Sequence, residues 1–367
     1  MTEQSEPESQ SRILLERRFL PFFITQFLGA FNDNVFKNAL IILIAFQGAQ
    51  FSSVDTNTLT NLSAGLFILP FFLFSATAGQ LIDKTEKSLS MQRIKMLEIF
   101  IMLCAAWAFS AGELYLLIAL LFLMGAQSSL FGPAKYSYIP QHLDDNELIA
   151  GNALVQMGTF VAILIGTMVG GLLIAREDGR ELVSIVLVVL AVLGYVSSRV
   201  IPRTPSPCPD LKINWNIFTE TWRNLAFIHS NRTVFLSVLG ISWFWFLGAT
   251  YLVQLPNYTR LTLGGNEQVV TLLLTLFTLG IGSGSLLCNW LSGQKVEIGL
   301  VPFGSIGLTL FGSDLYFARP LVEHTELIGL AAFWQQDGSL RVIVDVLLIG
   351  LFGGFYIVPL FALVQQR

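Results

Sequence analysis

Residues 26–40, QFLGAFNDNVFKNAL, place amides, a carboxylate and an ammonium inside a long apolar run. A charge at the centre of a membrane helix costs about 2.5–3.5 kcal/mol on insertion scales, so chains keep one where it lines an aqueous path or binds a substrate. On a helix, Gln26, Asp33 and Lys37 share one face. The spacing of Asp33 and Lys37 predicts an ion pair between them.

The composition also indicates a membrane protein. Hydrophobic residues make up 53% of the chain and charged residues 13%, about half the share in soluble domains. The mean hydropathy is +0.65. The net charge of −4 points to no particular partner because the charges lie mostly in loops, and we expect no nucleic-acid partner, cofactor or metal. The first apolar segment lacks a signal-peptidase pattern, so we expect a retained span.

A spanning helix needs about 20 mainly apolar residues, and this criterion predicts an all-α integral membrane protein with ten spans. We place them at about 19–47, 59–82, 94–111, 114–139, 148–175, 182–201, 233–255, 267–291, 298–317 and 341–364. Most of the 21 Lys and Arg residues, Lys95 among them, fall in segments on the same side as the N-terminus. Because cytosolic loops are enriched in these residues, we expect a cytosolic N-terminus.

A linker at residues 202–232 separates two apolar blocks. It opens with four prolines, and Trp215, Phe218, Trp222 and Leu225 then recur at helical spacing. This pattern predicts an amphipathic helix at the membrane interface. The predicted layout is a cytosolic tail at 1–18, a six-helix bundle at 19–201, the cytosolic linker at 202–232 and a second bundle of four helices at 233–367.

A weak internal repeat relates the two bundles. Residues 120–142 and residues 347–366 each combine an apolar helix, a glycine-containing centre, an aromatic residue, a proline and a Gln-bearing end. The tenth span would then correspond to the fourth. Two more spans are expected after Arg367, so ten of twelve would be present and the sequence would be a fragment.

The second span is followed by GQLIDKTEK at residues 79–87. Through Gly79, Asp83, Lys84 and Lys87 it resembles the loop pattern of the major facilitator superfamily, with Glu86 in place of the second glycine. Such a loop is expected to act in gating as a cytosolic latch, with the aspartate engaging helix N-termini and basic groups. The alternative is an ordinary basic loop.

The fourth span ends in FGPAKYSYIP at residues 131–140. Pro133 has no backbone N–H and is expected to kink or end the helix, which would put Lys135 at the cytosolic mouth. Lys135 either extends its ammonium to the interface or meets an anionic phosphate headgroup.

Five segments together resemble the bacterial lysophospholipid transporter family of the major facilitator superfamily. They are QFLGAFNDNVFKNAL, LPFFLFSATAGQLIDK, LFGPAKYSYIPQHL, GNALVQMGTFVAILIGTMVGG and GGFYIVPLFALVQQR. The resemblance is strongest to the transporter portion fused ahead of acyltransferase and acyl-carrier-protein synthetase domains. It implies a major facilitator fold in the bacterial inner membrane that flips lysophospholipids to the inner leaflet, where activities on the same or a neighbouring polypeptide reacylate them.

The resemblance and the polar pattern together suggest the substrate contacts. Asp33-Asn34 and Pro133 to Tyr136 match family motifs, whereas the arginine that some members carry in the seventh span is missing from residues 243–251. We expect the following substrate-binding residues: Gln26, Asn32, Asp33, Asn34, Lys37, Asn38, Lys135 and Gln156.

Other classes of function are less consistent with the sequence. No histidine is followed by aspartate at the H-x-x-x-x-D spacing of glycerolipid acyltransferases, so we do not expect an enzyme. There is no P-loop, which argues against ATP-driven transport. A proton-coupled exporter of drugs or other small molecules stays open as the alternative, because a buried carboxylate such as Asp33 can bind a proton.

Overall fold

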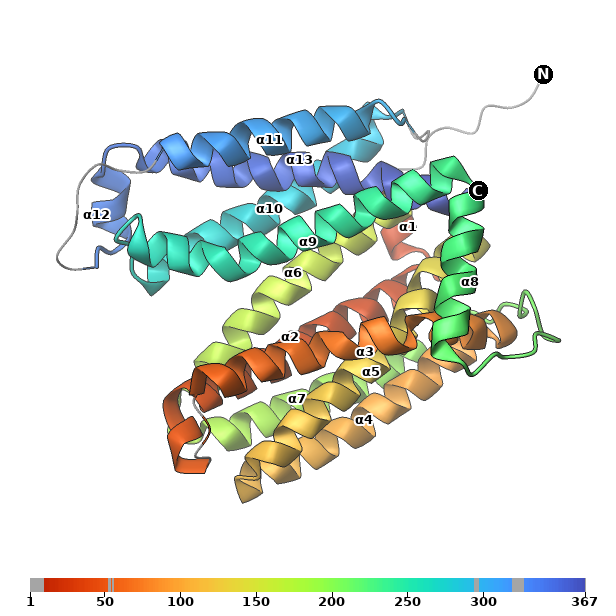
Figure 1. The fold of residues 1–367 in the computed structure, drawn as a ribbon, viewed down its shortest axis with the longest axis horizontal. Coiled ribbons are helices and arrows are strands. Elements are labelled where there is room, and N and C mark those ends of the chain that lie inside the picture. Colours follow the sequence, from red (N-terminus) through yellow and green to blue (C-terminus); the bar gives the residue numbers. More distant parts are fainter. Residues whose placement is uncertain (1–9, 52–53, 55, 294–296, 319–326, 367) are drawn as a thin grey trace. The chain divides into compact units, whose positions relative to one another are not determined.

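The computed structural model describes residues 10–51, 54, 56–293, 297–318 and 327–366 (Figure 1). The regular elements in these ranges are α-helices. The first half of the predicted N-terminal tail lies outside the described residues. So does Arg367, after which further spans are expected.

Within the described residues, ten helices are long and apolar enough to cross a membrane. This confirms the predicted all-α membrane fold and each of the ten predicted spans. The spanning helices are α2 (Leu20–Phe51), α3 (Thr56–Lys84), α4 (Lys87–Ala111), α5 (Leu114–His142), α6 (Leu148–Ile174), α7 (Gly179–Ser198), α9 (Arg232–Leu261), α10 (Glu267–Leu291), α11 (Leu300–Phe317) and α13 (Ser339–Gln365). The shorter helices are α1 (Gln10–Leu15), α8 (Ile217–Ser230) and α12 (Leu330–Gln335).

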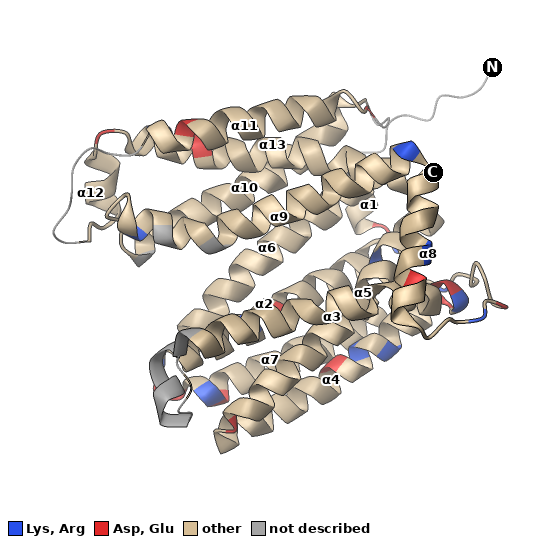
Figure 2. Ribbon diagram, viewed as in Figure 1, with Lys and Arg blue, Asp and Glu red and all other residues tan. Residues whose placement is uncertain are grey.

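The chain forms two compact units. The first, here called the N-unit, comprises Ile13–His142 and Ala162–Phe227. The second, the C-unit, contains Leu143–Val161 and Ile228–Arg367 together with the residues before Ile13. Helix α6 is therefore divided, with its first half in the C-unit and its second half in the N-unit. Charged residues are sparse along the long helices of both units (Figure 2).

The N-unit is a bundle around α2, α4, α5 and α7 with an apolar core. Phe36 on α2 meets Phe109 on α4 edge to face, with ring centroids 6.0 Å apart. Leu121 on α5 and Leu187 on α7 belong to the same buried cluster. Because lipid tails are as apolar as these side chains, close packing rather than exclusion from water holds such helices together.

The C-unit contains two small-residue motifs that face each other. Gly280 and Gly284 on α10 are spaced four apart, as are Gly350 and Gly354 on α13. A Cβ atom on Gly280 would lie 3.0 Å from the Cα of Gly350, and the reverse distance is also 3.0 Å. The two backbones thus approach more closely than side chains allow, which is how small-x-x-x-small motifs pack membrane helices.

The linker contains a helix, α8, that carries Phe218, Trp222 and Leu225 of the predicted pattern, whereas Trp215 lies just before it. The Phe218 side chain is 80% exposed and those of Trp215 and Trp222 are 74% exposed. The apolar side chains of this segment are therefore exposed rather than packed in a core.

We expect Gly284→Leu to destabilise the C-unit, because the new side chain would collide with the α13 backbone. Overpacking of this kind costs about 1–3 kcal/mol or more. The measurement is the thermal unfolding midpoint in detergent. Gly65→Leu is the matched control, since a Cβ there meets nothing within 4 Å. Equal midpoints for the two variants would contradict the proposed close approach.

Candidate functional site

A buried polar network joins three helices of the N-unit at Glu98. The Lys95 ammonium on the same helix, α4, donates to Glu98 Oε2 at 2.6 Å, and both side chains are 1% exposed. Asn32 Nδ2 on α2 donates to Glu98 Oε1 at 2.9 Å. Gln127 Nε2 on α5 donates to Oε2 at 3.1 Å. One carboxylate thus binds α2, α4 and α5 and has its charge balanced by Lys95.

Asp33 lies beside this network and has a different partner. The hydroxyl of Ser128 on α5 lies within donating distance of Asp33 Oδ2, at 2.7 Å, and of the Gln127 side-chain oxygen, at 3.1 Å. Asn32 on α2 therefore shares the Glu98 carboxylate with Gln127 on α5, and Asp33 on α2 bonds to Ser128, the next residue on α5. The hydroxyl has one proton and donates to one of these oxygens at a time, so Ser128 lies between Asp33 and the Gln127 amide that binds Glu98.

The predicted ion pair between Asp33 and Lys37 is wrong. Among the described residues no salt bridge within 4.0 Å joins them, and Lys37 Nζ instead donates to Asn34 Oδ1 at 2.9 Å. The ammonium also lies 5.4 Å from the ring centroid of Phe67. The ion pair does not form because Asp33 accepts the Ser128 hydroxyl from the neighbouring helix, and Lys37 donates to the side-chain oxygen of Asn34 on α2. Lys37 is left half-buried with no carboxylate bonded to it within the described part of the chain.

Two amides of the α2 stretch, Asn32 and Asn38, bond to neighbouring helices, and a third, Asn34, bonds to its own helix. Asn38 Nδ2 donates to the Thr167 hydroxyl on α6 at 3.1 Å, and Asn34 Nδ2 donates to its own helix at Ala30. Gln26 is buried. Part of the polar stretch therefore packs helices, and Asp33 and Lys37 remain the charged members. The remaining predicted residue, Gln156, is buried in the C-unit.

Sequence reasoning missed Lys95, Glu98, Gln127 and Ser128. Lys95 was counted among the cytosolic residues, which is wrong because α4 begins at Lys87 and carries Lys95 about 12 Å along its axis. The signals were present, since Glu98 stands inside an apolar run three residues after Lys95. Gln127 and Ser128 stand at the middle of another such run.

Lys135 lies on α5, which runs through Pro133 and ends at His142. Its ammonium lies 4.8 Å from the ring centroid of the adjacent Tyr136. The side chain is half-buried, and no carboxylate of the described residues forms a salt bridge with it. Lys135 is therefore, with Lys37, a second half-buried cation that pairs with no carboxylate of the described residues.

Helices α2 and α5 are antiparallel, which places the two cations on opposite sides of Asp33. Phe22 stacks on Tyr138 with centroids 4.6 Å apart, whereas Asp33 bonds to Ser128. Lys37 therefore lies about 6 Å beyond Asp33 in one direction, and Lys135 lies about 10 Å from Ser128 in the other. The two lysines are about 16 Å apart along the helix axes.

The predicted gating residues lie around the turn between α3 and α4. The Asp83 side chain is exposed, and its backbone carbonyl accepts the Ser206 hydroxyl at 2.8 Å and the Cys208 N–H at 3.2 Å. Lys87 is buried at the start of α4, while Gly79 and Lys84 are half-buried. The turn is thus fastened to the linker that follows α7.

Glu86, which departs from the loop pattern, caps α4. Its carboxylate accepts the backbone N–H of Ser88 at 2.8 Å and of Leu89 at 2.7 Å. It also accepts the N–H of Thr204 from the linker at 3.2 Å. A carboxylate at a helix N-terminus satisfies donors that no intrahelical carbonyl reaches, so Glu86 stabilises both α4 and the linker.

The sequence profile described as Major Facilitator Superfamily matches residues 22–367. This match spans nearly the whole chain, and the ten apolar helices agree with it. The chain belongs to the Major Facilitator Superfamily, and it is a multi-pass membrane protein.

Individual relatives narrow the comparison. The protein named lysophospholipid transporter LplT of Klebsiella pneumoniae is 27% identical over 377 residues, covering 99% of this chain and 84% of that protein. The solved structure of the proton:xylose symporter XylE aligns with a TM-score of 0.69 at 14% identity, covering 96% of this chain and 82% of that one. A bacterial homologue of the iron transporter ferroportin, solved in an outward-facing state, aligns with a TM-score of 0.63 at 17% identity, over 94% of this chain and 84% of that one. At these identities the two structures show the fold alone.

We expect Lys95→Met alone to destabilise the N-unit, because it leaves the Glu98 carboxylate buried without its cation. Removing one member of a buried pair typically costs about 3–5 kcal/mol. Adding Glu98→Gln to Lys95→Met should restore much of the loss, since no unpaired charge then remains. The measurement is the thermal unfolding midpoint in detergent. A double variant no more stable than Lys95→Met would show that Glu98 is not the group that Lys95 neutralises.

Proposed function

We propose that this protein is a secondary transporter that moves lysophospholipids across the bacterial inner membrane. The observation that carries the proposal is the arrangement of Lys37, Asp33 and Lys135 inside an apolar bundle. Two cations that no described carboxylate pairs flank one carboxylate on antiparallel helices. The lysophospholipid transporter relatives, similar along almost the whole chain, support the same substrate class.

The charge arrangement suits a lysophospholipid headgroup. Its phosphodiester is an anion, and an ammonium at low dielectric is a strong partner for it. Because Lys37 and Lys135 are about 16 Å apart along the axes, one phosphate does not bind both at once. We propose that it meets the two lysines in succession, on either side of Asp33.

Asp33 is proposed to receive the donors of the headgroup. Its Oδ2 accepts the Ser128 hydroxyl, and a carboxylate has capacity for further hydrogen bonds. An ethanolamine ammonium or glycerol hydroxyls supply such donors. Glu98 differs in this respect, since Lys95, Asn32 and Gln127 already bind both of its oxygens.

The single acyl chain needs an apolar surface. Aromatic side chains run along α2, where Phe23, Phe27 and Phe31 follow one another with centroids 6.3–6.4 Å apart. We propose that the chain lies along such aromatic walls or extends into the bilayer.

Further parts of the proposal concern the cellular setting. We propose a cytosolic N-terminus, delivery of the lipid to the inner leaflet, and reacylation there by acyltransferase and acyl-carrier-protein synthetase activities on the same or a neighbouring polypeptide. The turn at Asp83, Lys84 and Lys87, together with Gly79, is proposed to act in gating. Its attachment to the linker through Ser206 and Cys208 supports a mechanical role.

A second candidate function is proton-coupled transport of another small molecule. The observation that favours it is Asp33, a carboxylate in the bundle interior whose Oδ2 lies 2.7 Å from the Ser128 hydroxyl, since a buried carboxylate can hold a proton. Lysophospholipid uptake that persists in spheroplasts without a proton gradient would argue against this candidate.

We expect the double variant Asp33→Leu, Lys37→Leu to insert and express yet to transport no lysophospholipid. Removing both charges leaves no unpaired buried charge between them, so the fold should tolerate the change. The headgroup, in contrast, loses its contacts. The measurement is leaflet-resolved uptake of labelled lysophosphatidylethanolamine in spheroplasts. Near-normal uptake would show that these two residues are scaffolding.

We expect Lys135→Ala to weaken uptake of lysophosphatidylethanolamine and lysophosphatidylglycerol together, about tenfold, because both lipids present the same phosphodiester. Lys212→Ala, which removes an exposed linker lysine, is the matched control and should leave uptake unchanged. Uptake rates are measured for each lipid separately. Loss for one lipid and not for the other would contradict a shared phosphate contact.

A further inference from the structure

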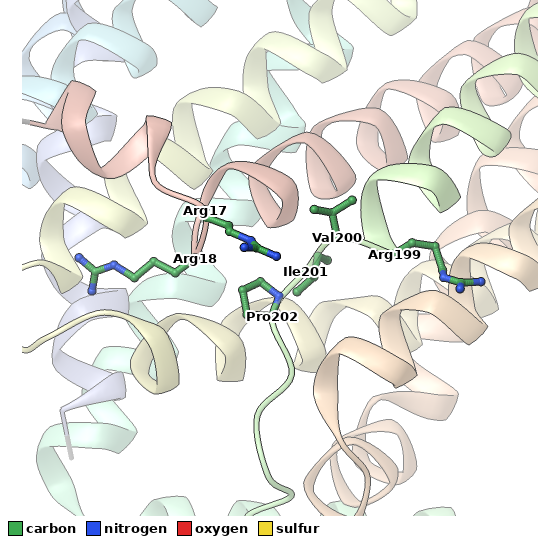
Figure 3. A pocket seen from close by; sticks show the side chains of 6 residues that line it. All are labelled: Arg17, Arg18, Arg199, Val200, Ile201 and Pro202. Atoms are coloured by element: carbon green, nitrogen blue, oxygen red, sulfur yellow. The ribbon is translucent and has the colours of Figure 1, made fainter.

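The three arginines near the start of α2 and the end of α7 do not face a common site. They line a cavity of about 590 Å³ whose lining residues are Arg17, Arg18, Arg199, Val200, Ile201 and Pro202 (Figure 3). Arg18 pairs with Glu16. Arg199 lies on the ring of Tyr195, and its side chain is directed away from Arg17. The arginine of the C-unit that lies among carboxylates is placed differently.

A charged cluster of the C-unit lies where α11 ends and α13 begins. Figure 2 shows the acidic positions of these two helices next to each other. Arg341 on α13 donates through Nε to Asp314 Oδ2 on α11 at 2.7 Å, and through Nη2 to Asp314 Oδ1. Both side chains reach the surface. A pair with two parallel bonds neutralises the Asp314 charge and joins the two helices.

The third member of the cluster, Asp345, is buried and lacks a donor. It lies one turn after Arg341 on α13 and is 2% exposed. Among the described residues, no group donates a hydrogen bond to Asp345 Oδ2. The side chains of Asp345 and Asp314 nevertheless lie within hydrogen-bonding reach of each other. Two ionised carboxylates are both acceptors, so this contact is favourable only when one of them carries a proton.

The other helices packed on α13 bring no compensating charge to Asp345. Among the described side chains, the charged groups that act on it are Asp314 and Arg341. On α9, Tyr251 packs on an aromatic ring of α10, and Tyr258 donates to a backbone carbonyl of α11 at 2.9 Å. Helix α12 carries no titratable side chain. The charge of Asp345 is therefore left to the Asp314–Arg341 pair.

The packing beside Asp345 favours a proton over a larger cation. Five residues further along α13, Gly350 lies against Gly280 of α10, where a Cβ on either glycine would be 3.0 Å from the Cα of the other. The two helices run parallel, which puts Cys288 of α10 about 20 Å from Asp345 along the axes. A metal ion such as Ca²⁺ takes about six or more oxygen ligands. The described residues hold no group of three or more His, Cys, Asp or Glu side chains placed for one. A proton needs a single lone pair and no cavity.

We propose that Asp345 binds a proton and shares it with Asp314, so that the C-unit has a protonatable site of its own. With the proton in place, the two carboxyl groups and Arg341 together carry no net charge. Without it, an uncompensated anion is buried beside α11, which is strongly unfavourable. The bound proton therefore helps to hold α11 and α13 together. The inference rests on the membrane fold and is independent of the substrate residues proposed above.

The first test is infrared spectroscopy of the purified full chain in dodecyl maltoside, a detergent without carbonyl groups. At neutral pH we expect the carbonyl stretching band of a protonated carboxylic acid. Asp345→Asn should remove intensity from this band, because an amide has no acid proton. Asp337→Asn is the matched control, since it removes an exposed carboxylate just before α13, and it should keep the full band.

The second test follows the thermal unfolding midpoint from acidic to alkaline pH. The midpoint of the unaltered protein should fall relative to that of Asp345→Asn as the pH rises, because loss of the proton leaves a buried anion only in the former. Asp337→Asn should follow the unaltered protein. The proposal is overturned if the unaltered protein shows no such infrared band at neutral pH. It is also overturned if Asp345→Asn keeps the full band, or if its midpoint runs parallel to that of the unaltered protein at every pH.

Discussion

The N-unit depends on one buried carboxylate. Glu98 accepts hydrogen bonds from Lys95, Asn32 and Gln127, so a single side chain fixes the relative rotation of α2, α4 and α5. A lone ion at this depth would cost several kcal/mol, and only a paired, fully bonded one is tolerated. The network therefore defines one arrangement of the three helices, because rotating any of them would leave a charge or an amide without its partner.

The positions of the candidate substrate residues follow from this arrangement. Once Gln127 is held by Glu98, the next residue along α5, Ser128, faces Asp33. Close packing of α6 against α2 adds a second constraint, since a Cβ on Gly166 would lie 2.6 Å from the Phe31 carbonyl. The α2 backbone is thus held from two sides near the polar stretch. The surrounding side chains and helices therefore hold Asp33 in place. A residue proposed to bind substrate needs such support.

The sequence predicted those features that a single helix determines, and it missed those that arise between helices. Ten spans could be found because length and apolarity are local properties, and α8 because its aromatic spacing is local. The pairing of Asp33 with Lys37 was wrong because the i, i+4 rule considers one helix, whereas Ser128 comes from another. Lys95 was misplaced because a basic residue near a span end is normally a loop residue. Its pairing with Glu98 is an i, i+3 pair within α4 that the spacing could have indicated, whereas the bonds from Asn32 and Gln127 to the same carboxylate come from other helices.

The four charged residues of this region differ in how many hydrogen-bond and charge partners the protein supplies to them. Lys95 and Glu98 are fully buried, bonded to each other and to two amides, so a passing ligand would have to break those bonds to interact with them. Asp33 has a hydroxyl, and Lys37 has an amide and an aromatic ring, which are weaker partners than an opposite charge. A substrate carrying both a phosphate and hydrogen-bond donors offers each of them a stronger partner than the protein does. The incomplete satisfaction of Asp33 and Lys37 is therefore the physical basis for proposing that they bind substrate, and the complete satisfaction of Glu98 is the basis for proposing that it is part of the scaffold.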